Sequence, residues 1–323
     1  MHPIPARHHV SPAIFHEIRA AAEPVVLKGV VADWPIVRTD DPSGWLRGLA
    51  TAKPVQFMRA PPEVGGRLHY ADGATGRNFE RGEATLAGFL DLLAAGQAEA
   101  LALQGLPAAT HLPGFAERNP MPLLPPAIGP RLWIGNAAKV ATHHDPSENI
   151  ACVAAGRRRF TLFPPEQVGN LYMGPFDPTP AGVQVSMVHV TAPDLARYPR
   201  FAEALAAALV AELEPGDALY IPYQWYHHVE ALDAFNVLVN YWWDPARADI
   251  GSPLDAMMAG MMSLRPLPPD QRRAWRAMFD HYVFLTKGDP GAHLAEGARG
   301  ILGATSPRDI AQMRRALLAR LQA

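Results

Sequence analysis

The chain has 323 residues, a length that suits two domains or one large domain with an appendage, and its hydrophobic content of 49% is enough for a sizeable core. Its net charge of −2 creates no field that attracts nucleic acid or an anionic membrane, and we expect neither as a partner. The 33 prolines and 26 glycines favour many turns and short strands over a helical bundle.

Cysteine usage and the lack of long apolar runs favour a cytoplasmic protein. The only cysteine, Cys152, has no partner within the chain, which excludes a disulfide framework and suits a reducing compartment. The first ten residues contain no apolar stretch typical of a signal peptide. No run reaches the roughly 18 apolar residues of a membrane span, so we expect none.

The first third of the chain alternates short helices and strands. Ser11 followed by Pro12 is typical of a helix start, and apolar spacing extends this helix to about Ala22. The same reasoning predicts further short elements, namely strands at residues 24–30, 55–58 and 100–104 and helices at 43–49 and 85–95.

Residues 111–130 are rich in proline and glycine and show little periodicity. Long irregular loops often carry function, so we expect this segment to lie over the mouth of the active site. The next strand is predicted at 131–135, where apolar residues return.

A dense series of short strands follows. Turn signals separate eight apolar stretches, at about 139–145, 149–155, 157–163, 183–190, 209–214, 217–222, 226–232 and 235–243. So many short strands favour a sandwich or barrel of the jelly-roll kind. The fold is therefore predicted to be mainly β, with flanking helices.

After Asp244 the pattern becomes helical. Helix starts are predicted at Ser252-Pro253, Pro269-Asp270 and Ser306-Pro307, with a break at 288–291. We therefore predict a catalytic domain at 1–245 and a C-terminal helical region at 246–323. The apolar faces of these helices predict a homodimer, because two-fold pairing is the commonest way to cover such faces. The alternative is that the helices pack on the outside of the barrel.

Two distant stretches carry the residues that can bind a metal ion. His143 and Asp145 are two positions apart, so on a strand their side chains share a face and His144 points away. Far downstream, His227 and His228 follow a Pro-Gly-Asp turn and an apolar strand. Two imidazoles and one carboxylate can cover one face of a metal and leave the other open, as in non-haem Fe(II) oxygenases. The spacing alone does not choose between His227 and His228.

Arg158 lies in a run of three arginines on a predicted strand, so it points opposite to Arg157 and Arg159. A buried guanidinium needs an anion, and its fork of donors suits a carboxylate. We interpret Arg158 as the partner of the distal carboxylate of a 2-oxo diacid. The alternative is that all three arginines are exposed.

Asn149 and Asn240 are polar residues in otherwise apolar strands. A buried amide must be hydrogen-bonded. These two side chains therefore either bond strand to strand or contact a ligand carboxylate beside the metal.

Taken together, these motifs resemble the Jumonji-C family of cupin-like oxygenases, which includes the asparaginyl hydroxylase of hypoxia-inducible factor and its bacterial relatives. The resemblance covers roughly residues 10 to 245. It rests on the segments Pro24–Gly29, Asp33–Pro35, Thr142–Asp145, Asn149, Gly156–Arg159, Leu162–Pro165, Pro215–Pro222 and Trp225–Val229.

The resemblance implies a double-stranded β-helix, the jelly-roll core of cupins, that binds Fe(II) and uses 2-oxoglutarate as co-substrate. By it, His143, Asp145 and His227 are the iron ligands, and His227 is chosen over His228. The resemblance also implies that the co-substrate is bound by Arg158, Asn149, Asn240 and Trp242. The implied reaction is hydroxylation of a protein side chain or a small molecule, and the family's hydroxylase dimerises through C-terminal helices.

Two positions depart from the family pattern. Val140 and Ala102 stand where the hydroxylase has a threonine and a tyrosine that help to bind the distal carboxylate. Arg158 keeps the basic character of a position at which the family often has lysine. Two other functions stay open. One is a metal-dependent cupin enzyme that does not use 2-oxoglutarate, for which Arg158 should face solvent. The other is a non-catalytic binding module on the same fold.

Overall fold

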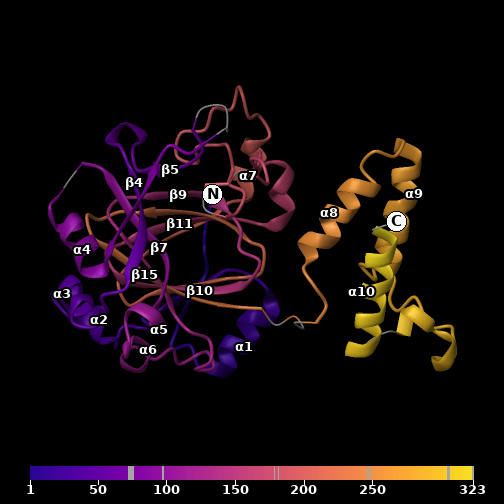
Figure 1. Ribbon diagram of the computed structural model, residues 1–323, viewed down its shortest axis with the longest axis horizontal. Coiled ribbons are helices and arrows are strands. Elements are labelled where there is room, and N and C mark those ends of the chain that lie inside the picture. The colour runs from indigo at the N-terminus through magenta and orange to yellow at the C-terminus, as the bar shows by residue number, and fades with distance from the viewer. Residues whose placement is uncertain are drawn as a thin grey trace. The chain divides into compact units, whose positions relative to one another are not determined.

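The computed structural model describes residues 1–71, 76–96, 98–177, 179–180, 182–244, 246, 249–303 and 306–321. The chain divides into two compact units, Met1–Asp244 and Pro245–Ala323. The first unit contains all the described strands, and the second contains helices (Figure 1). None of the described helices is long and apolar enough to cross a membrane.

Two sheets form the N-terminal unit (Figure 1). Their strands are β1 (His2–Pro3), β2 (Ala6–His8), β3 (Val25–Lys28), β4 (Pro54–Ala60), β5 (Arg67–Leu68), β6 (Glu80–Thr85), β7 (Ala100–Pro107), β8 (Arg131–Gly135), β9 (Lys139–His143), β10 (Glu148–Ala155), β11 (Arg158–Phe163), β12 (Leu209–Leu213), β13 (Ala218–Ile221), β14 (Tyr226–Ala231) and β15 (Asn236–Trp243). The six-stranded sheet has the order β1-β12-β11-β14-β9-β5, and the nine-stranded sheet has the order β2-β3-β13-β10-β15-β8-β7-β4-β6.

The jelly-roll core consists of four antiparallel strands from each sheet. Strands β12, β11, β14 and β9 lie in the smaller sheet, and β13, β10, β15 and β8 lie in the larger one. Alternation along β10 explains how this strand serves two layers, because Ala151 and Val153 pack between the sheets whereas Ile150 and Cys152 pack outside. The predicted jelly-roll fold, mainly β with flanking helices, is confirmed.

Short helices cover the outer faces of the sheets. On the larger sheet these are α1 (Pro12–Ala21), α2 (Pro35–Arg38), α3 (Pro42–Arg47), α4 (Leu86–Ala94), α5 (Ala108–His111) and α6 (Phe115–Arg118). Helix α7 (Phe201–Ala207) packs on the smaller sheet through Phe201 and Ala204, which contact an apolar cluster containing Phe163. The helices thereby bury the outer sheet faces, and the space between the sheets remains for the site.

Two expectations about loops are wrong. Residues 111–130 do not cover the site, because Leu112, Phe115 and Leu123 anchor this segment in the cluster between the helices and the outer sheet face. Residues 183–190 do not form a strand, since their ladder pairing is limited to an isolated bridge between Ser186 and Met173. The segment is largely apolar, but its backbone has no continuous strand beside it among the described residues.

The C-terminal unit contains α8 (Pro253–Ser263), α9 (Pro269–Tyr282) and α10 (Pro307–Leu321), together with two short 3₁₀ segments, Glu296–Ala298 and Gly300–Gly303. Ser252 caps α8 by accepting a hydrogen bond from the backbone N–H of Leu254. Within the described residues of this unit, no large apolar side chain is buried. The helices therefore form without a hydrophobic interior of their own.

Candidate metal centre

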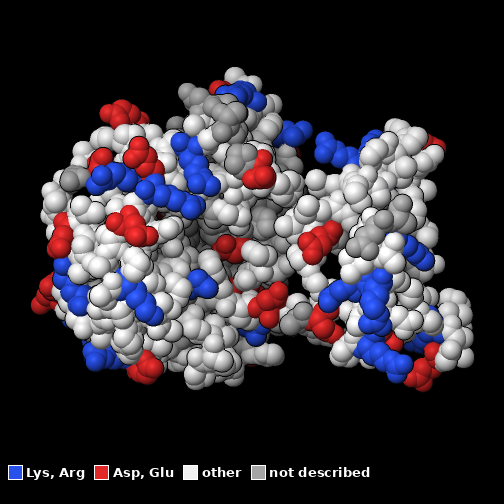
Figure 2. Space-filling model, viewed as in Figure 1, with Lys and Arg blue, Asp and Glu red and all other residues white. Residues whose placement is uncertain are grey.

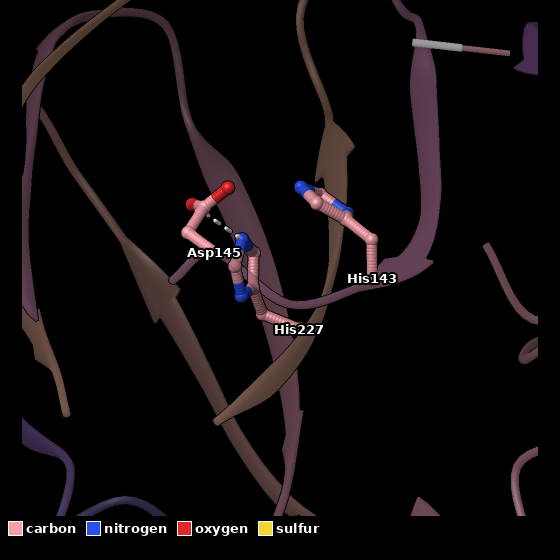
Figure 3. Close-up of side chains that lie close together, drawn as sticks. All are labelled: His143, Asp145 and His227. Atoms are coloured by element: carbon pink, nitrogen blue, oxygen red, sulfur yellow. Dashed lines mark ion pairs between the residues drawn. The ribbon is translucent and has the colours of Figure 1, made fainter. Parts of the chain in front are cut away.

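Three potential ligands meet in the space between the sheets (Figure 3). His143 is the last residue of β9, Asp145 lies in the turn that follows, and His227 lies on β14. One ligand atom from each residue lies within 4.8 Å of the other two. The Cα atoms of His143 and His227 are register partners, and Asp145 Oδ2 lies 3.6 Å from His227 Nε2. This donor set fits a metal bound on one face only.

Hydrogen bonds to the backbone orient both imidazoles. Nδ1 of His143 lies 2.9 Å from the carbonyl oxygen of Ala141, and Nδ1 of His227 lies 3.1 Å from that of Trp225. Because a carbonyl oxygen only accepts, each Nδ1 carries the proton and each Nε2 presents a lone pair. Burial also lowers the pKa of His227 to about 4, which keeps this ring neutral near pH 7. Both rings are therefore prepared to bind a metal through Nε2.

Asp145 reaches the cluster by a different route from the one expected. Strand β9 ends at His143, two residues before the predicted end, so Asp145 projects from the turn and not from an alternating strand position. A register shift also interrupts the pairing of β9 with β14 between His227 and Val229. Such bulges often lie next to active sites, where they redirect side chains.

The neighbouring histidines do not join the cluster. The His144 ring makes an edge contact with Tyr226, with 5.0 Å between centroids. His228 is buried on the opposite face of β14, with Nε2 3.8 Å from Glu230 Oε1. The structure thus brings together His143, Asp145 and His227, and separates them from His144 and His228.

Arg158 points inward from β11 while its neighbours point outward. Arg157 pairs with Asp233, and Arg159 pairs with Glu212. Arg158 is only 6% exposed, and burial lowers its pKa to about 10.

No described carboxylate pairs with Arg158. Its Nη2 reaches only the carbonyl oxygen of Trp133, at 3.4 Å, and its Nε has no hydrogen-bond partner among the described residues. A buried cation in this condition fits an anionic ligand.

Three polar side chains from the larger sheet, on β10 and β15, line the same cavity as Arg158 and the metal ligands. Asn240 Nδ2 donates a 2.8 Å hydrogen bond to Asn149 Oδ1, so the two amides bond strand to strand. Asn149 Nδ2, Asn240 Oδ1 and Trp242 Nε1 are buried without a partner among the described residues. These free atoms fit a polar ligand. The two asparagines can therefore bond to each other across the strands and also contact a ligand beside the metal.

A cavity of about 390 Å³ contains all seven candidate residues in its lining. Apolar side chains form most of the remaining wall, including Trp133, whose ring makes an edge contact with Trp242 at 5.1 Å. Val140 also lines this cavity, whereas Ala102 lies in an adjoining groove. Arg158 is the only lysine or arginine in the described lining, so it is the cationic partner available there for a carboxylate.

Sequence reasoning missed several residues of this wall. Trp133 faces the cavity from β8, and alternation along 131–135 could have indicated it. Gln104 is a polar residue at the end of an apolar run, a pattern that could have indicated it. Val183 and Val185 come from the segment misread as a strand.

A family model described as a cupin-like domain matches residues 11–249. Over 112 residues the chain is 37% identical to the lysine-specific demethylase JMJ31 of Arabidopsis thaliana, covering 34% of this chain and 20% of that protein. Over 159 residues it is 31% identical to the human bifunctional peptidase and (3S)-lysyl hydroxylase JMJD7, covering 42% and 46%.

The human HSPB1-associated protein 1 is a further relative, 37% identical over 113 residues that cover 34% of this chain and 22% of that protein. The chain therefore spans less than half the length of each of these curated relatives.

Proposed function

The chain belongs to the cupin-like domain family, and from that premise we propose that it is an Fe(II)- and 2-oxoglutarate-dependent oxygenase that hydroxylates a protein side chain or a small molecule. The observation that carries this proposal is the buried guanidinium of Arg158, which lines the same cavity as His143, Asp145 and His227 and has no described carboxylate partner. Two of the relatives are named as a lysyl hydroxylase and a lysine-specific demethylase, which supports the reaction class.

In this proposal the iron ligands are His143, Asp145 and His227. Bound iron supplies positions for the oxo acid and for oxygen, together with the oxidising chemistry. The backbone carbonyls of Ala141 and Trp225 hold the two imidazoles in the tautomer that ligation requires.

Four residues hold the co-substrate. Arg158 forms charge-assisted hydrogen bonds with the distal carboxylate of 2-oxoglutarate, which neutralises an otherwise unpaired buried charge. Asn149 Nδ2 and Trp242 Nε1 are free donors for oxygen atoms of the ligand. Asn240 fixes the Asn149 amide through its 2.8 Å hydrogen bond. The apolar walls limit the access of water to this pocket.

The other two functions have less support. If the protein were a metal-dependent cupin enzyme that does not use 2-oxoglutarate, the inward orientation and burial of Arg158 would have no functional explanation. A non-catalytic binding module gives no reason for two imidazoles and a carboxylate to lie within 4.8 Å with both Nε2 lone pairs available.

The test is anaerobic calorimetry with Fe(II) followed by 2-oxoglutarate. We expect 2-oxoglutarate to bind only after the metal, and Arg158→Ala to raise its dissociation constant roughly a hundredfold or more, as expected when one partner of a buried ion pair is removed. Arg157→Ala is the matched control, since Arg157 is exposed and pairs with Asp233. Equal 2-oxoglutarate affinity in the Arg158 and Arg157 variants is the result that excludes this role for Arg158.

The proposed assembly is a homodimer formed through the C-terminal helices, in a cytoplasmic protein. Trp275, Met278 and Tyr282 of α9 and Met313, Leu317, Leu318 and Leu321 of α10 are exposed in the single chain. Large aromatic and methionine side chains are typical of the centre of an interface. On the face shown in Figure 2, acidic and basic side chains of the N-terminal unit are interspersed, which does not favour a nucleic acid partner.

A further inference from the structure

We propose that Gln104 is a specificity-determining residue and that the segment of substrate entering the cavity is uncharged and largely apolar, so that a cationic side chain is rejected. The proposal rests on the function proposed above and deepens it by naming the substrate class. It also separates this chain from the lysine chemistry in the names of two of its relatives.

Strand alternation places Gln104 on the cavity wall, and a strand irregularity follows it directly. In the pairing of β7 with β8, Leu103 faces Ile134 but Leu106 faces Leu132, so β7 has one extra residue. Gly105 lies within this bulge at φ +67°, a conformation that favours glycine. On a regular strand Gln104 and Gly105 would face opposite sides, yet both line the cavity. Alternation with Ala100 and Ala102 turns Gln104 inward, away from the outer face of Leu103, and the bulge adds Gly105 beside it on the same wall.

Gln104 also borders two spaces. Gln104 and Met58 line both the main cavity and an adjoining groove on β4, β6 and β7, whose other lining residues include Gln56 and Arg81. No hydrogen bond to the Gln104 side chain is found among the described residues. Its amide is a free donor and acceptor that a neutral polar group of the substrate can satisfy.

The charges that line these two spaces disfavour a cation. Asp145 is the only carboxylate among the described residues that line the cavity, and it is assigned to the metal. The other charged side chains that line the two spaces are cationic, the buried Arg158 in the cavity and the exposed Arg81 in the groove, and Arg158 has no described carboxylate partner. A buried ammonium here would lose its hydration without gaining a partner, and such burial is strongly unfavourable.

The rest of the cavity wall is apolar. Beyond the residues assigned to metal and co-substrate, it includes Met58, Leu68, Phe79, Val140, Val183 and Val185. Apolar walls with few polar groups are typical of pockets that bind by burial and orient the ligand through a small number of hydrogen bonds. Gln104 is the neutral polar side chain on that part of the described wall, and we infer that it orients the substrate.

The experiment compares two probes of equal chain length, hexanamide and hexylammonium. Each is titrated by calorimetry into the protein loaded with zinc and 2-oxoglutarate, which keeps Asp145 and Arg158 engaged and prevents turnover. We expect the wild-type chain to bind hexanamide about tenfold or more tightly than hexylammonium. The amide can exchange hydrogen bonds with the Gln104 side chain, whereas the ammonium would be buried without a carboxylate to accept its hydrogen bonds.

Two substitutions test the residue itself. Gln104→Glu supplies the missing carboxylate and should shift the ratio of the two affinities toward hexylammonium by about tenfold or more. Gln104→Leu removes the amide and should weaken hexanamide binding without improving hexylammonium binding. Gln56→Glu is the matched control, because it adds the same charge in the groove but outside the cavity and should change the ratio by less.

Equal or tighter binding of hexylammonium by the wild-type chain overturns the proposal, as does an equal response to Gln104→Glu and Gln56→Glu. Failure to bind either probe also counts against it, since the proposal requires the apolar wall to accept an alkyl chain beside the bound co-substrate. These outcomes are distinct from failure of the proposed function, which appears as absence of 2-oxoglutarate binding before any probe is added.

Discussion

Arg158 is the residue whose environment is hardest to explain without a ligand. A buried charge with no partner destabilises a folded protein, and a chain keeps such a group only where something else compensates. A carboxylate that binds during turnover is such a compensation. Stability and function should therefore conflict at this one position.

Arg158→Met is predicted to raise the free energy of unfolding of the ligand-free protein by about 1 kcal/mol or more, because it replaces an unpaired buried charge with an apolar side chain. The variant should lose the stabilisation by 2-oxoglutarate, which at 100 times the dissociation constant is about 2.7 kcal/mol in the wild-type chain. Thermal unfolding of the metal-loaded protein with and without 2-oxoglutarate measures both effects. A destabilised Arg158→Met variant that still responds to 2-oxoglutarate contradicts the account.

At the residue scale, alternation was a good guide where the strand is regular. It correctly placed Arg158 inward on β11, between Arg157 and Arg159 in their exposed ion pairs. It gave a wrong reason for Asp145, because β9 ends at His143. Alternation also gives Gln104 the inward face of Ala102, although Gln104 is not among the predicted site residues, whereas the bulge that adds Gly105 to this wall is not revealed by single-sequence periodicity.

At the element scale, β10 links the site to the core. One face of this strand carries Asn149 and Ala151 toward the space between the sheets, and the other carries Cys152 into the cluster beneath the helices. Strands β13 and β15 pair with it on both sides. The asparagine is thereby held on one of the most enclosed elements of the fold.

Cys152 provides a probe of that enclosure. The side chain is fully buried, and burial raises the pKa of its thiol, so very little reactive thiolate exists at any pH where the fold persists. We expect no reaction of the native protein with a thiol reagent, and one reactive thiol per chain once denaturant unfolds the N-terminal unit. Rapid labelling of native protein, measured by mass spectrometry, is the contrary result.

Elements with strong local signals were predicted well. Ser11 accepts a hydrogen bond from the backbone N–H of Ile14 at the start of α1, and Thr85 does the same for Gly88 at the start of α4. Residues 111–130 and 183–190 were misplaced because their positions depend on contacts with distant parts of the chain. Composition showed that 111–130 is irregular but not which face of the sheet it covers.

At the scale of the whole molecule, the C-terminal unit differs from the rest. Its described residues bury no large apolar side chain, although methionines, aromatic residues and leucines are frequent in its helices. Most helical stability in proteins comes from packing of an apolar face. The predicted homodimer would supply that packing.

Light scattering of the full chain at micromolar concentration is expected to give twice the 35.1 kDa mass of one chain. Placing a charge on the exposed apolar positions, as in the double variant Trp275→Glu and Leu317→Glu, should shift the mass toward that of a monomer. Arg273→Glu is the control, because it changes a polar, exposed position of the same helix α9. A monomeric wild-type chain rules out this assembly.

The most direct test of the central claim is the formation of succinate from 2-oxoglutarate in air. The account predicts iron-dependent succinate formation by the wild-type chain, its loss in His143→Ala, and its persistence in His144→Ala, since His144 contacts Tyr226 outside the ligand cluster. Metal binding should be lost in the first variant and kept in the second. Absence of iron-dependent succinate from the wild-type chain, or an equal loss in both variants, would contradict it.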